Sequence, residues 1–510
     1  MTALDLVNHI PVLPEVLLLV GACAVMIVDA RSADARRSAG FVLAQVVLLA
    51  CALCTLWVLK VQVEAGGSKL FLFGGLFVSD VMSGFLKLVT YVATWAALVY
   101  SRQYLLDRSL LRGEFLSLLL FSLLGMMILV SAGSFLTVYL GLELMSLCLY
   151  ALVALNRDSA ASTEAAMKYF VLGALSSGLL LYGMSMVYGA TGSLELQEVS
   201  RQVKSLLSSG ADRVPMRPFL VFGLVFVVAG IAFKVGVAPF HMWIPDVYHG
   251  APTPVTLIIG SGPKLAALAM AIRLLVDGML DLAQDWQQML GLMALLSMAI
   301  GNITAIAQTN LKRMLAYSTI AHMGFMLLGL MSGVVGGNRL SAPDAYSAAL
   351  FYGVVYVVMA LAAFGMILLL ARPGFEADTL DDMRGLSKRS PWYAFVMMVV
   401  MFSLAGIPPT VGFYAKLAVF QVAVAAGYLW LAVAAVLLSL VGAFYYLRIV
   451  KLMYFDEMRD SPGASQPARH GKGMEWLLSA NGMALLVLGV LPQGLMALCF
   501  AAIQSLKIPG

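Results

Sequence analysis

Lysine is the side chain in this 510-residue sequence whose position most strongly suggests chemistry. Five lysines lie within long apolar stretches, namely Lys87, Lys168, Lys234, Lys264 and Lys416, and we assign no arginine to the interior of such a stretch. An ammonium at the centre of a bilayer costs at least roughly 2.5–3.5 kcal/mol on insertion scales, so an intramembrane lysine is expected to have a function. Burial favours the neutral amine, so a buried lysine can release its proton, whereas an arginine stays charged. These residues predict proton transfer.

Two of the lysines lie beside prolines. Lys234 precedes Pro239 by five residues, and Lys416 follows Pro408 and Pro409. Proline removes an N–H group and kinks a helix, and the freed carbonyls are tolerated only where protein or water surrounds them. Each break therefore predicts a polar, hydrated cavity at membrane depth. Interrupted spans at matching places in two halves also indicate a transporter site built on an inverted repeat.

Carboxylates are rarer than lysines in the apolar stretches. Glu143, in VYLGLELMSLCLYALV, lies well inside one, whereas Asp80, Glu164 and Asp246 lie near the ends of theirs. A carboxylate at that depth needs a partner, and we expect Lys234 to be that partner.

Composition predicts an all-α polytopic membrane protein, because 61% of residues are hydrophobic, 12% are charged and the mean hydropathy is +0.92. With Met1 placed outside, the cytoplasmic connections carry twice as many lysines and arginines as the opposite ones, as the positive-inside rule requires.

Runs of roughly twenty apolar residues predict about fourteen spans. They lie near 14–29, 39–59, 79–101, 114–131, 134–155, 164–190, 217–248, 252–276, 286–308, 313–333, 345–371, 391–422, 427–450 and 474–503.

The expected organisation is two inverted repeats of five helices, each with one Pro-broken helix, flanked by further spans. Two connecting segments differ from the spans: 193–217 predicts an amphipathic surface helix, and 459–473, rich in Gly, Ser and Pro, predicts a flexible loop. The predicted units are an N-terminal three-helix segment, 1–113, the first repeat, 114–276, the second repeat, 277–453, and a loop with the last helix, 454–510.

The sequence predicts no metal, redox or nucleotide site in this chain. Its five cysteines all lie in apolar segments, and the Cys51/Cys54 spacing has no second pair to complete a zinc or iron–sulfur site. We therefore expect the cysteines to pack as small hydrophobic residues. Neither GxGxxG nor a P-loop motif is present.

Three motifs resemble a known family. They are GLELMSLCLYALVAL, FKVGVAPFHMWIPDVYHGAPTPV and NLKRMLAYSTIAHMGFMLLG. They are similar to the antiporter-like membrane subunits of respiratory complex I, the proton-pumping NADH:quinone oxidoreductase. Within that family, PFHMWIPDVYHGAP resembles the N branch more than the L or M branches, and the resemblance covers almost the whole chain.

The resemblance implies roles for particular residues. Glu143 matches the family's glutamate on the fifth helix, and Lys234 matches the lysine of the broken seventh helix with which that glutamate pairs. Lys264 matches the central lysine of the eighth helix, and Lys416 matches the basic residue of the broken twelfth helix, at the exit side. The auxiliary polar positions implied are Lys168, near the glutamate, and His241, Tyr317 and His322, along the central axis.

The resemblance also implies a setting. The chain would be a subunit of a translocase enzyme in the bacterial inner membrane, with both termini on the periplasmic side. It would contact an M-type antiporter-like subunit, small membrane subunits and lipid, but no nucleic acid. NADH, FMN, iron–sulfur clusters and quinone would bind to partner subunits, and no cofactor would bind to this chain.

Structural roles remain open for several of these residues. Lys234 and Glu143 could form an ion pair that only locks two helices, and Lys168 could form an ordinary helical pair with Glu164. Lys87 is expected to reach the interface by snorkelling. The residues His241, Tyr317 and His322 could be satisfied core residues. Two other functions also stay open for the chain, a subunit of a multisubunit cation/proton antiporter and a non-pumping membrane scaffold.

Overall fold

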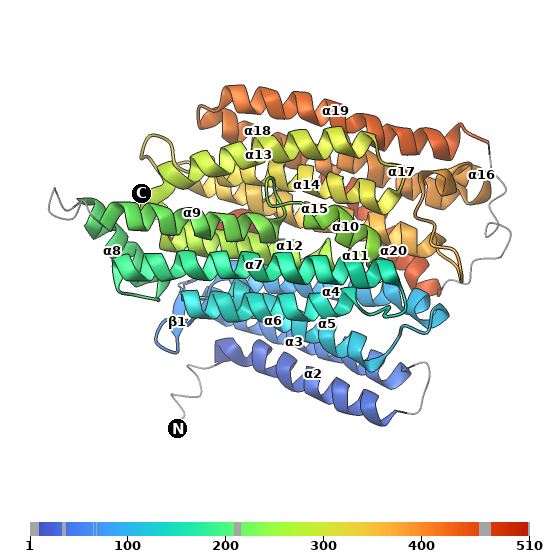
Figure 1. Cartoon of the computed structure of the whole chain (residues 1–510), viewed down its shortest axis with the longest axis horizontal. Helices are drawn as coiled ribbons and strands as arrows, with labels where there is room; N and C mark the ends of the chain where they lie inside the picture. The colour runs from blue at the N-terminus through green and yellow to red at the C-terminus, as the bar shows by residue number, and fades with distance from the viewer. Residues whose placement is uncertain are drawn as a thin grey trace.

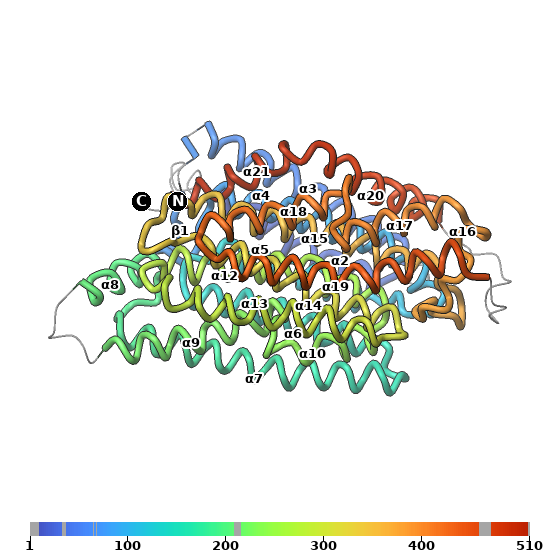
Figure 2. Tube along the Cα trace, turned by 90° about the horizontal axis from the view of Figure 1, so that it is seen from above, coloured from blue at the N-terminus to red at the C-terminus, as the bar shows by residue number. Residues whose placement is uncertain are grey.

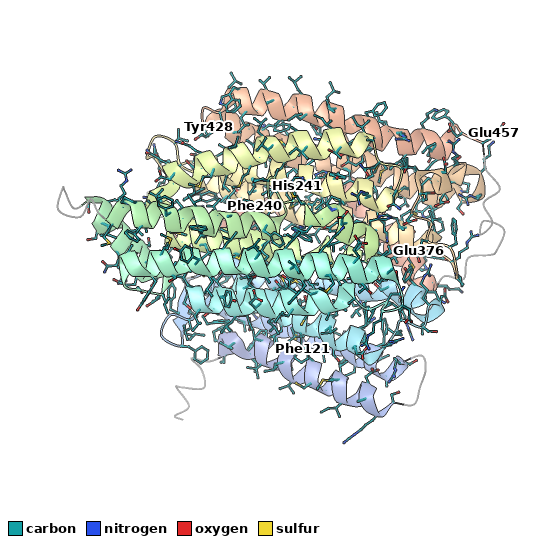
Figure 3. The ribbon with its side chains drawn as sticks, in the orientation of Figure 1. Phe121, Phe240, His241, Glu376, Tyr428 and Glu457 are labelled. Atoms are coloured by element: carbon teal, nitrogen blue, oxygen red, sulfur yellow. The ribbon has the colours of Figure 1, made fainter. Side chains whose placement is uncertain are left out.

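The helices of this protein run side by side along one direction (Figure 1). The computed structural model describes residues 10–32, 37–64, 66–67, 69–208, 216–457 and 471–507. A hairpin of β1 (Leu70–Leu72) and β2 (Phe77–Ser79) and the helix α8 (Leu196–Ser208) lie at one end of the bundle, which we call the hairpin end. Glu376 and α16 (Leu386–Arg389) lie at the other, which we call the Glu376 end (Figure 3).

Twelve helical segments in the described residues are long and apolar enough to cross a membrane. Together with α14 and one broken helix pair they match the fourteen predicted spans, which confirms the fold class. The unbroken helices are α2 (Leu13–Arg31), α3 (Ser38–Glu64), α4 (Val81–Asp107), α5 (Gly113–Val130), α6 (Phe135–Val153), α7 (Ala160–Thr191), α13 (Ala283–Ile306), α14 (Leu311–Leu330), α15 (Ala342–Leu370) and α19 (Leu429–Tyr454).

Both predicted breaks at proline are present. In the first, α9 (Met216–Val235) is separated from α10 (Trp243–Gly250), and in the second α17 (Pro391–Ala405) is separated from α18 (Val411–Ala425). The first half of each pair ends at a glycine in the left-handed region, Gly236 with φ +89° and Gly406 with φ +83°. Glycine ends a helix this way because it carries no Cβ to clash.

Two spans predicted as continuous are interrupted. The segment 252–276 is divided into α11 (Thr253–Ile259), α12 (Gly262–Ala271) and the π-helix η3 (Ile272–Gly278). Pro263 lies in the first turn of α12, where its missing N–H costs nothing, so it starts a new helix after Gly260 and Ser261. Pro492 likewise separates the last predicted span into α20 (Lys472–Val490) and α21 (Gln493–Gln504).

The predicted surface helix is α8, which buries Leu196, Val199 and Val203 along one face and exposes its charged residues. Residues 209–215 and 458–470 lie outside the described residues, so the prediction of a flexible loop concerns mostly residues that are not described. The short 3-10 helices are η1 (Ile10–Val12), η4 (Leu280–Leu282) and η5 (Leu380–Met383).

The most buried helices occupy the centre of the bundle. Every residue in the apolar window of Thr253–Gly278 is buried, and α15 is nearly as enclosed, whereas α3 and α20 bury a minority of theirs. Figure 2 shows α7 and α9 along one edge of the molecule and α20 and α21 along the opposite one. The central helices therefore carry side chains that meet other protein groups rather than lipid.

Candidate functional site

Lys264 reaches from α12 to the first helix break. Its Nζ donates a hydrogen bond of 2.8 Å to the carbonyl oxygen of Val235, the last residue of α9. The side chain of Lys264 is 3% exposed. The last carbonyls of a helix have no partner within the helix and carry the negative end of its dipole. The broken end of α9 therefore provides an acceptor for a buried ammonium.

Lys416 makes the same kind of contact at the second break. Its Nζ donates to the carbonyl oxygens of Ala405 (2.8 Å) and Leu404 (3.2 Å) at the end of α17, and to Ser439 Oγ in α19 (2.9 Å). A Cβ on Gly406 would lie 2.8 Å from the Cδ of this lysine. Gly406 thus both ends α17 and leaves room for the amine.

Lys234 does not form the expected ion pair with Glu143. Its Nζ donates instead to Ser146 Oγ (3.0 Å) and Tyr150 OH (3.5 Å), both on α6. Glu143 lies one helical turn before Ser146, and its Oε1 is buried without a hydrogen-bond partner in the described part of the chain. Positions three apart on a helix are neighbours, so the carboxylate and the amine occupy adjacent places along one face of α6.

Aromatic rings lie between Lys234 and Lys264. The Lys234 Nζ is 5.7 Å from the ring centroid of Phe233, which stacks on Trp243 at 5.5 Å, and the Lys264 Nζ is 5.0 Å from the Trp243 centroid. Tyr169 stacks on the other face of the group, 4.5 Å from Trp243. Ring faces attract cations, so both ammoniums are held against the same aromatic cluster.

His322 forms the next polar group, on α14. Its Nδ1 lies 2.7 Å from Tyr352 OH, and its Nε2 lies 3.1 Å from Tyr446 OH, which also bonds Ser318. The ring of Phe325, one turn along α14, lies beneath the Lys416 ammonium at 5.0 Å. Lys416, on α18 of the second broken helix, and His322, on α14, are therefore close neighbours.

Two other predicted axis residues behave differently. Tyr317 is half-buried against the apolar core, and its neighbour Ser318 makes the contact with Tyr446. Ser318, Tyr352 and Tyr446, which sequence reasoning missed, form the polar group with His322. His241 lies at the first break, midway along the bundle (Figure 3), and its Nδ1 is buried without a hydrogen-bond partner in the described residues.

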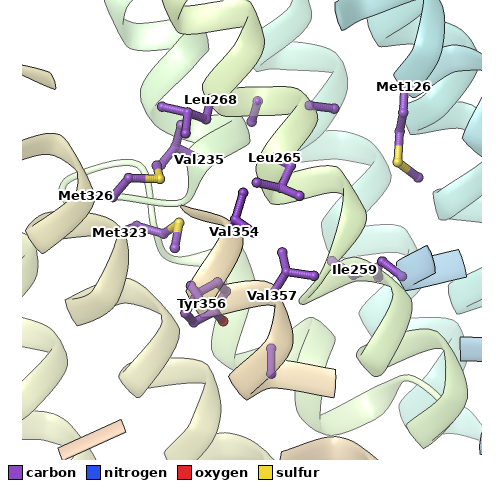
Figure 4. Close-up of a cluster of buried hydrophobic side chains, with 14 of the residues drawn as sticks. Met126, Val235, Ile259, Leu265, Leu268, Met323, Met326, Val354, Tyr356 and Val357 are labelled. Atoms are coloured by element: carbon purple, nitrogen blue, oxygen red, sulfur yellow. The ribbon is translucent and has the colours of Figure 1, made fainter. Parts of the chain in front are cut away.

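An apolar cluster lies between the two halves of this polar series. Figure 4 shows it, with side chains from α9, α12, α14 and α15. A Cβ on Gly353 would lie 3.0 Å from Leu268 Cδ2 and 3.5 Å from Met326 Sδ, so both side chains reach the same point of α15. The cluster includes Val235, Leu265, Leu268, Met323, Met326, Val354, Tyr356 and Val357.

Lys168, on α7, is part of a cluster of charged side chains. It is exposed, and its Nζ lies 2.8 Å from Glu164 and 2.8 Å from Asp246, which also bonds Arg313 at 2.8 Å. The helical pair with Glu164, one of the two readings of the sequence, is therefore formed. These charges neutralise one another at the first turn of α10, where Asp246 lies.

Lys87 does not snorkel, because it is buried in an ion pair with Glu15. The Nζ–Oε1 distance is 2.5 Å, and the side chains are 4% and 7% exposed. Glu15 lies in the first turn of α2, where the positive end of the helix dipole favours a carboxylate. The pair therefore joins α2 to α4.

Arg273 was counted from the sequence with the basic residues of the outer connections, and the structure places it inside the bundle. It is fully buried in η3 rather than exposed in a connection, and it bonds Asp80 through both terminal nitrogens (2.7 and 2.8 Å) and Asp277 (2.8 Å). Burial acts to raise the pKa of Asp80, but the charges of Arg273 and Lys69 and the backbone N–H of Ser83 outweigh it and hold that pKa below its ordinary value. In this network Arg273 and Lys69 both contact carboxylates, so their positive charges are compensated.

The chain is similar to known proteins along most of its length. The family model of the NADH:quinone oxidoreductase/Mrp antiporter transmembrane region matches residues 132–442. A relative from Herminiimonas arsenicoxydans, NADH-quinone oxidoreductase subunit N, is 57% identical over 500 residues, 97% of this chain and 98% of the relative. The chain belongs to the NADH-quinone oxidoreductase subunit N family.

Solved structures agree with this family. A chain of respiratory complex I from Thermus thermophilus with bound aureothin is 30% identical with a TM-score of 0.76, and the match covers 95% of this chain and 98% of that one. A chain of the Mrp complex from Dietzia sp. DQ12-45-1b has a TM-score of 0.80 at 21% identity, covering 99% and 100%, and supports the fold alone. Within the described residues, no three His, Cys, Asp or Glu side chains lie together in a way that could hold a metal ion.

Proposed function

We propose that this chain is a proton-translocating membrane subunit of an NADH:quinone oxidoreductase, and that its buried amines carry the protons. The observation that carries this proposal is the set of acceptors around three lysines. In the described chain, the hydrogen bonds of Lys234, Lys264 and Lys416 go only to hydroxyl and carbonyl oxygens. Neutral acceptors stabilise an ammonium less than a carboxylate does, so each amine can give up its proton and regain it.

Glu143 sets the charge of the first amine. While the carboxylate is charged and close to Ser146, it favours the protonated form of Lys234. When a neighbouring event draws the carboxylate away, the ammonium loses that stabilisation and passes its proton on. The amine of Lys234 is then neutral. Its proton has moved, through water, to His241 or Lys264.

The later steps use His322 and Lys416. The two nitrogens of His322 face two different hydroxyl groups, so the ring can accept a proton on one side and release one from the other. The apolar cluster between Lys264 and His322 blocks the path while it is dry, since a hydrophobic constriction gates by wetting. Lys416 then delivers the proton to the exit side.

The family and the charge distribution support the following setting. The hairpin end would face the periplasm of a bacterial inner membrane, with both termini on that side. An M-type subunit and small membrane subunits would be its neighbours, and NADH, FMN, iron–sulfur clusters and quinone would lie in partner subunits. The broken helices would belong to two inverted repeats, 114–276 and 277–453.

The test is Lys234→Met in the assembled complex. Proton pumping per NADH oxidised should fall sharply, because a thioether side chain carries no proton. Lys60→Met is the matched control, since Lys60 is exposed on α3 and pairs with Glu64. An unchanged proton stoichiometry in Lys234→Met would refute the proposal.

Two other functions make different predictions. If the chain were a subunit of a cation/proton antiporter, the Lys234→Met mutant would lose sodium tolerance and keep NADH-driven respiration. The likeness to the Mrp chain extends only to the fold. A scaffold function predicts that Lys416→Ala spoils assembly rather than pumping. Native gel electrophoresis of solubilised membranes separates that outcome from ours.

A further inference from the structure

A groove between α3 and α4 opens on the outer surface of the bundle. Its walls are apolar and include Val42, Val46, Leu49, Val92 and Trp95, all of them exposed. The groove has a volume of about 690 Å³. Figure 1 shows α2 at one edge of the molecule with α3 beside it, and the exposure of the lining side chains places the groove on the outer surface.

A polar chamber of about 990 Å³ continues the groove toward the Glu376 end. The two hollows share Phe41, Gln45 and Arg102. Arg37 and Gln103 also line the chamber. The cavity is therefore amphipathic along its length, apolar at membrane depth and basic where the helices reach the interface.

Arg102 is placed to bind an anion. Its guanidinium lies over the ring of Phe41, with Cζ 4.4 Å from the ring centroid, and it forms no ion pair with a carboxylate in the described residues. The nearby carboxylate of Asp107 accepts a hydrogen bond from Gln103 at 2.7 Å instead. Arg37 adds a second positive charge, partly offset by Asp29 at 3.6 Å.

The length of the groove fits a lipid acyl chain. The apolar walls extend along α3 from Phe41 to Ala52, a rise of about 16 Å, which is close to the roughly 15 Å of one leaflet's hydrocarbon. An anionic lipid matches both parts of this cavity, since its acyl chains fit the apolar walls and its phosphate fits the basic end.

We propose that this groove is a binding site for an anionic phospholipid, with its acyl chains between α3 and α4 and its phosphate at Arg102 and Arg37. Basic pockets between membrane helices on the cytoplasmic side bind anionic head groups. Guanidinium groups match phosphate oxygens in geometry as well as charge. The site lies on the N-terminal helices, outside the lysine series, and does not depend on proton transfer by this chain.

The first test measures phosphatidylglycerol retained by the purified whole complex, by lipid mass spectrometry after titration with dioleoyl phosphatidylglycerol. Arg102→Gln should weaken binding of one phosphatidylglycerol about fivefold, since a basic residue near the surface contributes roughly 1 kcal/mol. Arg112→Gln is the matched control, because Arg112 is exposed at the same end and does not line the groove. Equal retention in both variants overturns the proposal.

The second test identifies what occupies the groove. The photo-crosslinking amino acid p-benzoylphenylalanine at Val46, in the assembled complex, should form an adduct with the mass of a phospholipid. An adduct with another polypeptide, or no adduct with lipid, overturns the proposal. Proton pumping per NADH oxidised should be unchanged within twofold in Arg102→Gln. A negative result for lipid binding therefore leaves the proposed proton path untouched.

Discussion

The buried basic side chains of this protein fall into two groups with different partners. Lys87 and Arg273 face carboxylates, those of Glu15 and Asp80, at distances of 2.5 and 2.7 Å. The amines Lys264 and Lys416 face backbone carbonyls at helix breaks. A carboxylate partner holds the positive charge in place, since removing either member leaves a buried charge unpaired. The partner that a buried basic side chain contacts, more than its depth of burial, therefore distinguishes a structural cation from a proton carrier.

The location of each group supports this difference. Asp80 caps the start of α4, and Glu15 lies in the first turn of α2, so the paired charges join the ends of helices. The amines that face carbonyls lie where a helix stops inside the bundle, at Val235 and Ala405. A broken helix supplies acceptors at a depth where an unbroken helix has none.

The largest expected effect is loss of pumping in Lys264→Met. The variant removes the amine that lies between Lys234 and the second broken helix, so proton translocation through this subunit should fall to background. Assembly should persist because a methionine fills a similar volume. Proton pumping per NADH oxidised in reconstituted vesicles measures the effect, with native gels as the assembly control. Normal pumping would show that carbonyl-bound amines are not required.

Arg273→Gln should act on stability instead. Breaking a buried pair costs roughly 3–5 kcal/mol, because Asp80 is left charged and unpaired. We expect a lower thermal midpoint of the purified complex and less assembled complex in membranes. Pumping per assembled complex should stay near the native value. The double variant Arg273→Gln/Asp80→Asn should recover part of the lost stability, and no recovery would argue against the pairing as the cause.

Ser439→Ala should have the smallest effect. It removes one of three hydrogen bonds to the Lys416 amine, a contribution of roughly 0.5–1.5 kcal/mol. Pumping should fall by a few-fold at most, and assembly should be unaffected. Stopped-flow measurement of proton release can resolve a change of this size. A complete loss would mean that the serine, rather than the carbonyls of α17, holds the amine.

The sequence predicted the broken helices well because their signals are local. Gly236 with Pro239 and Gly406 with Pro408 mark helix ends wherever they fold. The fourteen spans follow from hydropathy in the same way. The signal at Pro263 was also local, in GSGPK, but it lies inside a run apolar enough to suggest one continuous span.

The partners of the buried charges could not be predicted, because they come from distant parts of the chain. Nothing near Lys234 indicates that Ser146 rather than Glu143 accepts its hydrogen bond. Arg273 was counted with the connections because it lies near the end of the predicted span 252–276, whereas the π-helix η3 continues that span to Gly278. The tyrosines at 352 and 446 resemble ordinary packing residues until the fold places them around His322.

Arginine in place of lysine gives the most direct test, since it keeps the charge and cannot release a proton at accessible pH. Lys416→Arg and Lys87→Arg are compared by proton pumping per NADH oxidised in equally assembled complexes. If carbonyl-bound amines carry the protons, Lys416→Arg loses pumping while Lys87→Arg, still paired with Glu15, keeps it. Native pumping in Lys416→Arg, or equal loss in both variants, would contradict the claim that carbonyl-bound amines carry the protons.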